Sequence, residues 1–72
     1  MGLVVMNYSF NGENRPLQQG LTIKIALEQG GLQKLAGIAV AVNDDVVPSG
    51  DWDSYEIKNN DAILVITATQ GG

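Results

Sequence analysis

The alternation of apolar and polar positions predicts a β-hairpin near the beginning of the chain. Across Met6 to Phe10 every second residue is apolar, which is the period of two expected of a strand with one buried face. The pair Asn11-Gly12 follows directly and favours a type I′ turn, in which both central residues have positive φ. A second strand is therefore expected from about Glu13 to Gln18. It should lie at a sheet edge, because Pro16 has no N–H to donate to a neighbouring strand.

A helical periodicity replaces the alternation over Ile23 to Gln29. Apolar residues stand at positions i, i+3 and i+4 of this segment, as Ile23, Ala26 and Leu27, and this spacing places them on one face of a helix. The threonine before the segment can cap its first N–H groups. Gly30-Gly31 should end the helix by supplying a left-handed residue. One short helix with a single buried face is predicted.

Two continuously apolar segments predict further strands. Ile38 to Val42 is one, and Ala62 to Ile66, continued by β-branched residues as far as Thr69, is the other. An uninterrupted apolar run is typical of a strand buried on both faces, so the segment that begins at Ala62 should lie near the centre of a sheet. Between the two segments, Asn43-Asp44-Asp45 predicts a turn into the short strand Val46 to Pro48.

The segment after that short strand predicts a turn and one more extended piece. Ser49 to Trp52 reads as a tight turn that buries Trp52, and Tyr55 to Ile57 as a short extended segment. The polar run Lys58 to Asp61 then delivers the chain to the last strand.

This order of elements predicts an α+β domain with the β-grasp fold, which is ubiquitin-like. One mixed sheet should be crossed by one main helix, with the last strand parallel to the first at its centre. Residues 1–69 are expected to form the single domain, and residues 70–72 a flexible Gly-Gly tail.

The helix can cover only one face of such a sheet. If Ile63 and Val65 point towards the helix, then the side chains between and after them, Leu64, Ile66 and Ala68, lie on the open face. An apolar patch of this kind favours a docking surface for a partner. The alternative is that residues 3–5 or the loop of residues 32–37 cover it, and the sequence leaves both open.

Composition excludes most independent catalysis. The 72 residues include no cysteine and no histidine, so a thiol nucleophile, a thiolate metal site and the usual general base are all missing. The spacing of Asp51 and Asp53 begins like a calcium loop, but Glu56 stands where that loop needs glycine. We therefore expect no metal site and no bound cofactor in this chain.

Net charge and hydropathy bear on location and partners. The formal net charge of −4 argues against nucleic acid and anionic membrane surfaces, and mildly favours a partner with a basic rim. No apolar run reaches the roughly 18 residues that span a bilayer. The first residues lack the basic segment of a signal peptide, so a cytoplasmic location is expected.

Three features coincide from Met6 to the last residue: the β-grasp order of elements, the segment Val42 to Pro48 followed by Trp52, and the C-terminal Gly71-Gly72. Together they resemble the ThiS family, the sulfur carrier proteins of thiamine biosynthesis. The related small subunit of molybdopterin synthase, MoaD, shares the fold and the tail but usually lacks the Val-Pro and Trp segment. It is the second candidate, and a ubiquitin-like binding module without chemistry at its tail is the third.

The resemblance implies that Gly72 carries the reacting group, its α-carboxylate. A ThiF-type adenylyltransferase would activate this carboxylate with ATP and Mg²⁺, a persulfide protein would supply sulfur, and the resulting thiocarboxylate would serve thiazole synthase (ThiG). The chain would then be a co-substrate and not an enzyme, while the final sulfur acceptor stays open. Partners are expected to contact the residues near this end of the chain, namely Leu64, Ile66, Ala68, Gln70 and Gly71.

Overall fold

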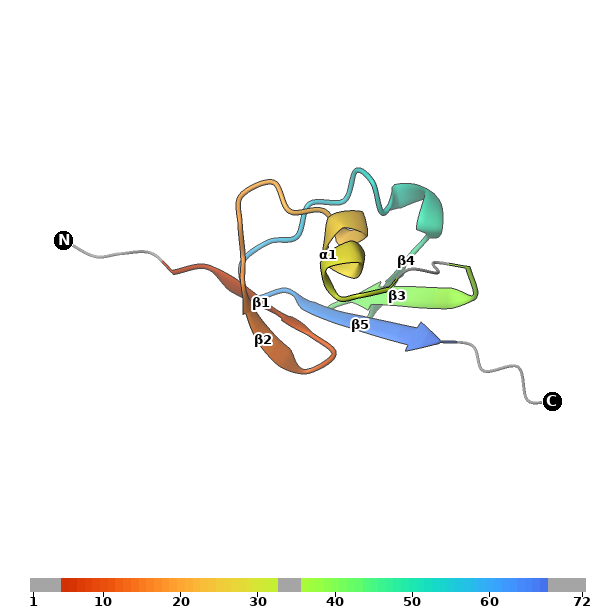
Figure 1. Ribbon diagram of the computed structural model, residues 1–72, viewed down its shortest axis with the longest axis horizontal. Helices are drawn as coiled ribbons and strands as arrows, with labels where there is room; N and C mark the ends of the chain where they lie inside the picture. Colours follow the sequence, from red (N-terminus) through yellow and green to blue (C-terminus); the bar gives the residue numbers. More distant parts are fainter. Residues whose placement is uncertain (1–4, 33–35, 68–72) are drawn as a thin grey trace.

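A computed structural model describes residues 5–32 and 36–67 of the chain (Figure 1). The expectations for Ala68, for the tail residues 70–72 and for residues 1–4 lie outside these described residues. Their outcome is therefore not decided by the fold.

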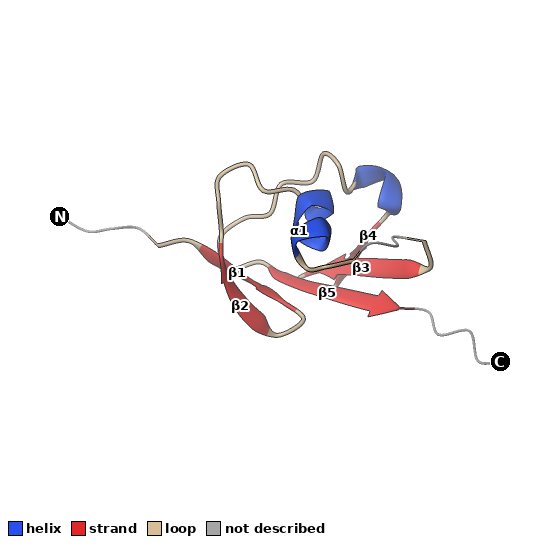
Figure 2. Cartoon of the chain, viewed as in Figure 1, coloured by secondary structure: helices blue, strands red, loops and turns tan. Residues whose placement is uncertain are grey.

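The described residues form a five-stranded mixed sheet with the order β2-β1-β5-β3-β4. A main helix and a short 3₁₀ helix lie on the same side of this sheet (Figure 2). Together with the parallel pairing of β1 and β5, this arrangement confirms the predicted α+β, β-grasp architecture. The elements are β1 (Asn7–Phe10), β2 (Glu13–Pro16), α1 (Ile23–Gln29), β3 (Ile38–Val42), β4 (Asp45–Val47), the 3₁₀ helix η1 (Ser49–Asp51) and β5 (Ala62–Thr67).

The first hairpin forms as predicted but is shorter. Asn11 and Gly12 have φ values of 50° and 84°, so both central residues of the turn are left-handed. β2 lies at the sheet edge, and it ends at Pro16 instead of Gln18. Met6 does not join the buried face, since it precedes β1 and is 38% exposed.

Helix α1 has the predicted bounds and the predicted buried face. The Thr22 hydroxyl accepts a hydrogen bond from the Ile25 N–H at 3.3 Å, which satisfies one donor of the first turn. Gly30 is the C-cap residue of the helix and has a φ of −77°. The next residue, Gly31, has φ +84° and supplies the left-handed position after the cap, as predicted.

The core lies between α1 and the sheet. Its largest fully buried side chains come from β1, α1, β3 and β5, and are Tyr8, Ile23, Leu27, Val40 and Ile63. The turn after β4 contributes Trp52, which is 5% exposed and whose Nε1–H donates to the Val47 carbonyl at 2.9 Å. Burial of this indole confirms the role predicted for the turn, because its one polar atom is paired.

The second hairpin forms as predicted, but β4 covers Asp45–Val47 instead of Val46 to Pro48. Asn43 and Asp44, between β3 and β4, have φ values of 51° and 74°. The extended piece before β5 is reduced to one isolated bridge, from Glu56 to Thr22.

The final strand corrects one expectation. β5 is central, parallel to β1 and antiparallel to β3. It is not buried on both faces, however, because Leu64 and Ile66 are 50% and 52% exposed. An uninterrupted apolar run does not report which face a neighbouring layer covers, and here the helix covers only one.

Candidate docking face and C-terminal strand

Side chains of β5 alternate between the core and solvent. Ile63 is 2% exposed and Val65 packs against the same core. The residues between and after them, Leu64 and Ile66, point to the opposite face. Among the described residues, neither the Leu32 side of the loop nor Val5 covers this face, since Leu32 packs against the core and Val5 is itself 73% exposed.

The neighbouring strands extend this apolar surface. Leu64 is paired with Ala41, and Ala41 is paired with Val46 on the other side; paired residues share a face of the sheet. Val46 is 73% exposed, which makes it one of the most accessible apolar side chains described. A second row runs from Ile66 to Ala39. We call this set the open-face patch: Ala39, Ala41, Val46, Leu64 and Ile66.

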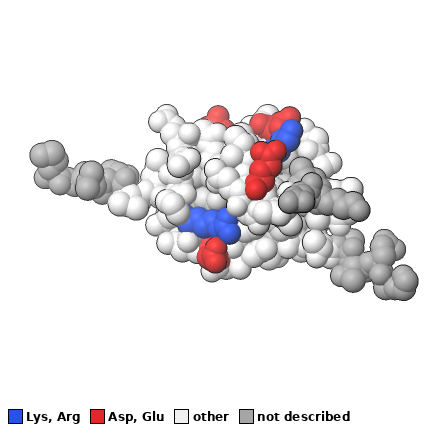
Figure 3. Space-filling model, in the orientation of Figure 1, with Lys and Arg blue, Asp and Glu red and all other residues white. Residues whose placement is uncertain are grey.

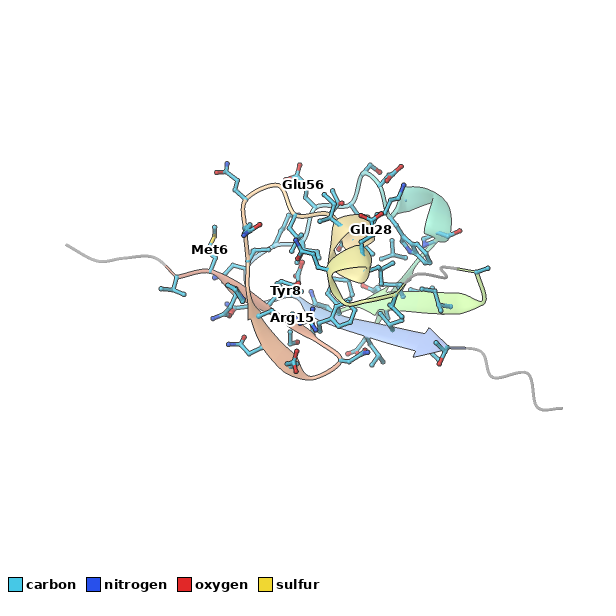
Figure 4. All side chains as sticks on the ribbon, in the orientation of Figure 1. Met6, Tyr8, Arg15, Glu28 and Glu56 are labelled. Carbon is cyan, nitrogen blue, oxygen red and sulfur yellow. The ribbon has the colours of Figure 1, made fainter. Side chains whose placement is uncertain are left out.

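Charged residues of the strands all lie on the other face. Glu13, Arg15 and Asp45 are paired with the core residues Phe10, Tyr8 and Val42, and so share their orientation towards the helix layer. Figure 4 shows Tyr8 and Arg15 next to each other on β1 and β2, and Glu28 on α1. Within the described strands, the open face therefore carries no charged side chain.

Two pairs of opposite charges lie on the helix side. The Arg15 guanidinium lies 3.0 Å from the Glu13 carboxylate and 4.7 Å from the centre of the Phe10 ring. The Lys24 amine lies 3.5 Å from the Asp53 carboxylate. Figure 3 shows basic side chains against acidic ones on this view of the surface. Such exposed pairs contribute little to stability.

The beginning of β5 is fixed on its β3 side by a side-chain network. The Asn43 amide oxygen accepts from the Ala62 N–H at 2.9 Å, and the Asn43 amide nitrogen donates to the Asp61 carboxylate at 2.9 Å. The second carboxylate oxygen of Asp61 accepts from the Lys58 N–H at 2.8 Å. Together these bonds fix the position of the first residue of β5 relative to the two turns that precede β4 and β5.

The middle of β5 is fixed on its β1 side by Asn11. Its backbone N–H donates to the Ile63 carbonyl at 2.9 Å, and its side-chain oxygen accepts from the Val65 N–H at 2.8 Å. Two asparagines therefore hold the strand that carries the tail, one from each side.

A hollow on the helix side is separate from this strand. Residues of α1 and of the η1 turn line it: Lys24, Ser49, Gly50, Trp52 and Asp53. Lys24 and Asp53 pair across it at 3.5 Å, so its charges are already matched. Among residues 5–32 and 36–67 no three carboxylates gather as a metal site would need, and no helix is long and apolar enough to cross a bilayer.

The fold brings together part of the predicted set. Leu64 and Ile66 lie side by side on the open face, while Ala68, Gln70, Gly71 and Gly72 lie outside the described residues. Sequence reasoning missed Val46, because the strand Asp45–Val47 does not alternate polar and apolar residues, and so its sequence carries no signal of which valine is exposed. It also missed the contacts of Asn11, for which the sequence carries no signal beyond the turn.

Comparison with known proteins decides the family. A family model described as the ThiS family matches residues 8–72, from β1 through the last residue. This chain belongs to the ThiS family. The segment that resembled the family in the sequence is therefore part of a match that spans nearly the whole chain.

Curated relatives agree with this membership. "Sulfur carrier protein ThiS" of Escherichia coli (strain K12) is 33% identical over 67 residues, which cover 93% of this chain and 100% of the relative. A protein of the same name from Thermus thermophilus is 36% identical over 62 residues, covering 86% of this chain and 94% of the relative.

A solved structure supports the fold. The crystal structure of thiamine biosynthesis protein ThiS from Geobacter metallireducens superposes with a TM-score of 0.76 at 22% identity, covering 93% of this chain and 100% of that one. At this identity the likeness speaks for the β-grasp fold alone.

Proposed function

We propose that this protein is a sulfur carrier whose C-terminal carboxylate is converted to a thiocarboxylate. The observation that carries the proposal is the reach of the family match, which continues through Gly72, among relatives named sulfur carrier proteins. The chain is then a co-substrate of other enzymes, as its lack of cysteine and histidine also suggests.

The carboxylate of Gly72 has to be activated before sulfur can enter. It is ionised at neutral pH and is a poor electrophile in that state. A ThiF-type adenylyltransferase would transfer AMP from ATP to one carboxylate oxygen with release of pyrophosphate, and Mg²⁺ would neutralise the phosphates on the enzyme. ATP and Mg²⁺ belong to the partner in this scheme.

Sulfur would then replace the activated oxygen. The terminal sulfur of a protein persulfide attacks the acyl carbon and AMP leaves, which gives an acyl disulfide between carrier and donor. A second thiol forms a disulfide with the donor sulfur and releases the thiocarboxylate. That group is a soft nucleophile, suited to attack a carbon electrophile on thiazole synthase (ThiG).

The open-face patch is the surface proposed to dock these partners. Leu64 and Ile66 are half exposed and uncharged neighbours surround them, so their burial against a partner would remove apolar area from water. Ala68, Gln70 and Gly71 follow in the chain and would contact the channel that receives Gly72. Because glycine has no side chain, the last two residues would fit even a narrow channel.

Deletion of Gly72 tests the proposal. We expect the shortened chain to keep its fold and to lose adenylation, because its new carboxylate stops one residue, roughly 3.3 Å, short of the reacting position. ATP–pyrophosphate exchange with the cognate activating enzyme measures this step. Undiminished exchange by the shortened chain would refute the role of Gly72.

A full-length chain with a C-terminal carboxamide is the matched control. It has the same length and fold but no carboxylate, so it should bind the enzyme and support no exchange. A binding module without tail chemistry predicts the opposite, that capping changes nothing. With the enzyme, ATP and a persulfide donor, intact mass should then show exchange of one oxygen for sulfur on the unmodified chain only.

A further inference from the structure

The backbone groups of β5 point alternately to its two neighbours. The Ala62 carbonyl accepts from the Asn43 N–H at 2.9 Å, so the backbone N–H and carbonyl of Ala62 point towards β3. In an antiparallel pair every second residue repeats this direction, and Leu64 and Ile66 therefore also bond towards β3. The alternate residues of the strand, Ile63, Val65 and Thr67, direct their N–H and carbonyl groups towards the β1 side.

In the part of the chain that the structure describes, the β1 side of β5 is occupied only at the beginning of the strand. β1 pairs with β5 at two positions, Ser9 with Ala62 and Phe10 with Ile63. Asn11 then supplies the next two bonds, to the Ile63 carbonyl and from the Val65 N–H. Beyond this point the hairpin has turned, and β5 continues past it (Figure 1).

Three backbone groups remain on this side after Asn11. They are the Val65 carbonyl and the N–H and carbonyl of Thr67, and nothing within residues 5–32 and 36–67 pairs with them. Within the described sheet, the central strand thus becomes an edge strand in its last part, and such an edge is a template for an added strand.

We propose that an extended segment of the activating enzyme pairs with this edge of β5, at Val65 and Thr67, and so extends the sheet when the carrier docks. Strand addition takes its affinity from backbone bonds and its selectivity from the flanking side chains. Here the flanking side chains are those of Leu64 and Ile66, which directly precede Val65 and Thr67 in β5 and belong to the open-face patch. The inference rests on the proposed function.

The length of the chain after Thr67 supports an enzyme as the occupant. Five residues follow, ending in Gly71-Gly72, and they span at most roughly 17 Å when fully extended. An enzyme that holds the Gly72 carboxylate in its active site must therefore lie within that distance of the edge. Pairing there would also align the strand with the channel, which lowers the entropy lost when the tail is ordered.

Three chains with changes at residue 67 test the pairing. Thr67→Pro removes the N–H, and because this N–H points away from β3 the β3 ladder keeps all its bonds. Thr67→Val keeps the N–H and is the matched control. A third chain, made by ligation, replaces the amide between Ile66 and Thr67 by an ester, which removes the N–H without a proline ring and weakens the Ile66 carbonyl as an acceptor towards β3; the free energy of unfolding of this chain is measured beside its affinity.

The expected result is a weaker complex for the proline and ester chains. Loss of one backbone bond should raise the dissociation constant for the activating enzyme roughly 3- to 10-fold, while Thr67→Val binds like the natural chain. In amide hydrogen exchange, the Thr67 N–H should become protected in the complex, whereas the Val65 N–H is protected already in the free chain.

Equal affinities of all three chains, with unchanged exchange at Thr67, would overturn the inference. So would a concentration-dependent dimer of the free chain that Thr67→Pro abolishes, since a second copy would then occupy the edge. If the proposed function itself is wrong, the result is a different one, because the natural chain would not be adenylated. Adenylation of the natural chain together with equal affinities rejects strand pairing alone.

Discussion

Asn11 and Asn43 each serve the fold twice. Both occupy left-handed turn positions, with φ of 50° and 51°, which asparagine tolerates better than most residues. Each also donates its N–H to a β5 carbonyl and accepts from a β5 N–H through its side chain. A glycine would satisfy the turn equally well, but it would leave the strand one bond short on that side.

Asn11→Gly separates these two roles. The backbone conformation is kept and the bond from Val65 is lost, so we expect the free energy of unfolding to fall by about 1 kcal/mol. Urea titration followed by the fluorescence of the single tryptophan, Trp52, measures it. Asn11→Asp keeps an acceptor oxygen and should retain more stability. A glycine variant as stable as the natural chain, with Val65 still protected from exchange, would show that the bond contributes nothing.

At the scale of elements, the sheet separates its two faces by chemistry. The helix side holds the core and the charged residues of the strands, and the open face carries the open-face patch. The patch crosses three neighbouring strands, β4, β3 and β5. Its exposed members would gain from burial against an apolar partner surface.

Ile66→Asp tests the role of this face. A charge in the middle of the patch would have to be desolvated on docking, so binding to the activating enzyme should weaken at least about tenfold, which corresponds to about 1.4 kcal/mol. The domain should stay folded because Ile66 is 52% exposed. Isothermal titration calorimetry measures the affinity.

Ile25→Asp is the control for that experiment. Ile25 lies on α1, in the layer opposite the patch, and is 42% exposed, so a charge there disturbs a similar apolar side chain. Its binding should be unchanged. Equal weakening by both variants would place the docking surface elsewhere.

At the scale of the whole molecule, one small core carries the stability. A chain of 72 residues is near the lower size at which a hydrophobic core suffices without disulfides or metals. The strand that bears the tail shares this core through Ile63. Any large loss of packing in this core should therefore unfold β5, the strand that precedes the C-terminal residues, together with the rest of the domain.

Leu27→Ala should show this dependence. Leu27 is fully buried, and its truncation is expected to lower the free energy of unfolding by about 2–5 kcal/mol. Ile25→Ala, two residues earlier and half exposed, should cost less than about 1 kcal/mol. Denaturant unfolding measures both. A Leu27→Ala loss no larger than that of Ile25→Ala would contradict a single shared core.

Much of the fold could be predicted because its signals are local. The pair Asn11-Gly12 fixed a turn through the φ values it requires, and the spacing of Ile23, Ala26 and Leu27 placed one helix face. The edge position of β2 followed from Pro16. The burial of β5 on both faces was wrong, because composition along a strand does not show how many layers pack on it.

The sequence by itself determined the main elements, their order and the resemblance to the ThiS family, since turn chemistry, periodicity and motif are properties of neighbouring residues. The tertiary structure decided what only long-range contacts can decide. It brought Val46 beside Leu64 through Ala41, and it ended the pairing of β1 with β5 at Asn11. The first hairpin turns back at Asn11 while β5 continues, which leaves three backbone groups of β5 without partners among the described residues; the alignment of these two distant segments is not encoded by any local pattern.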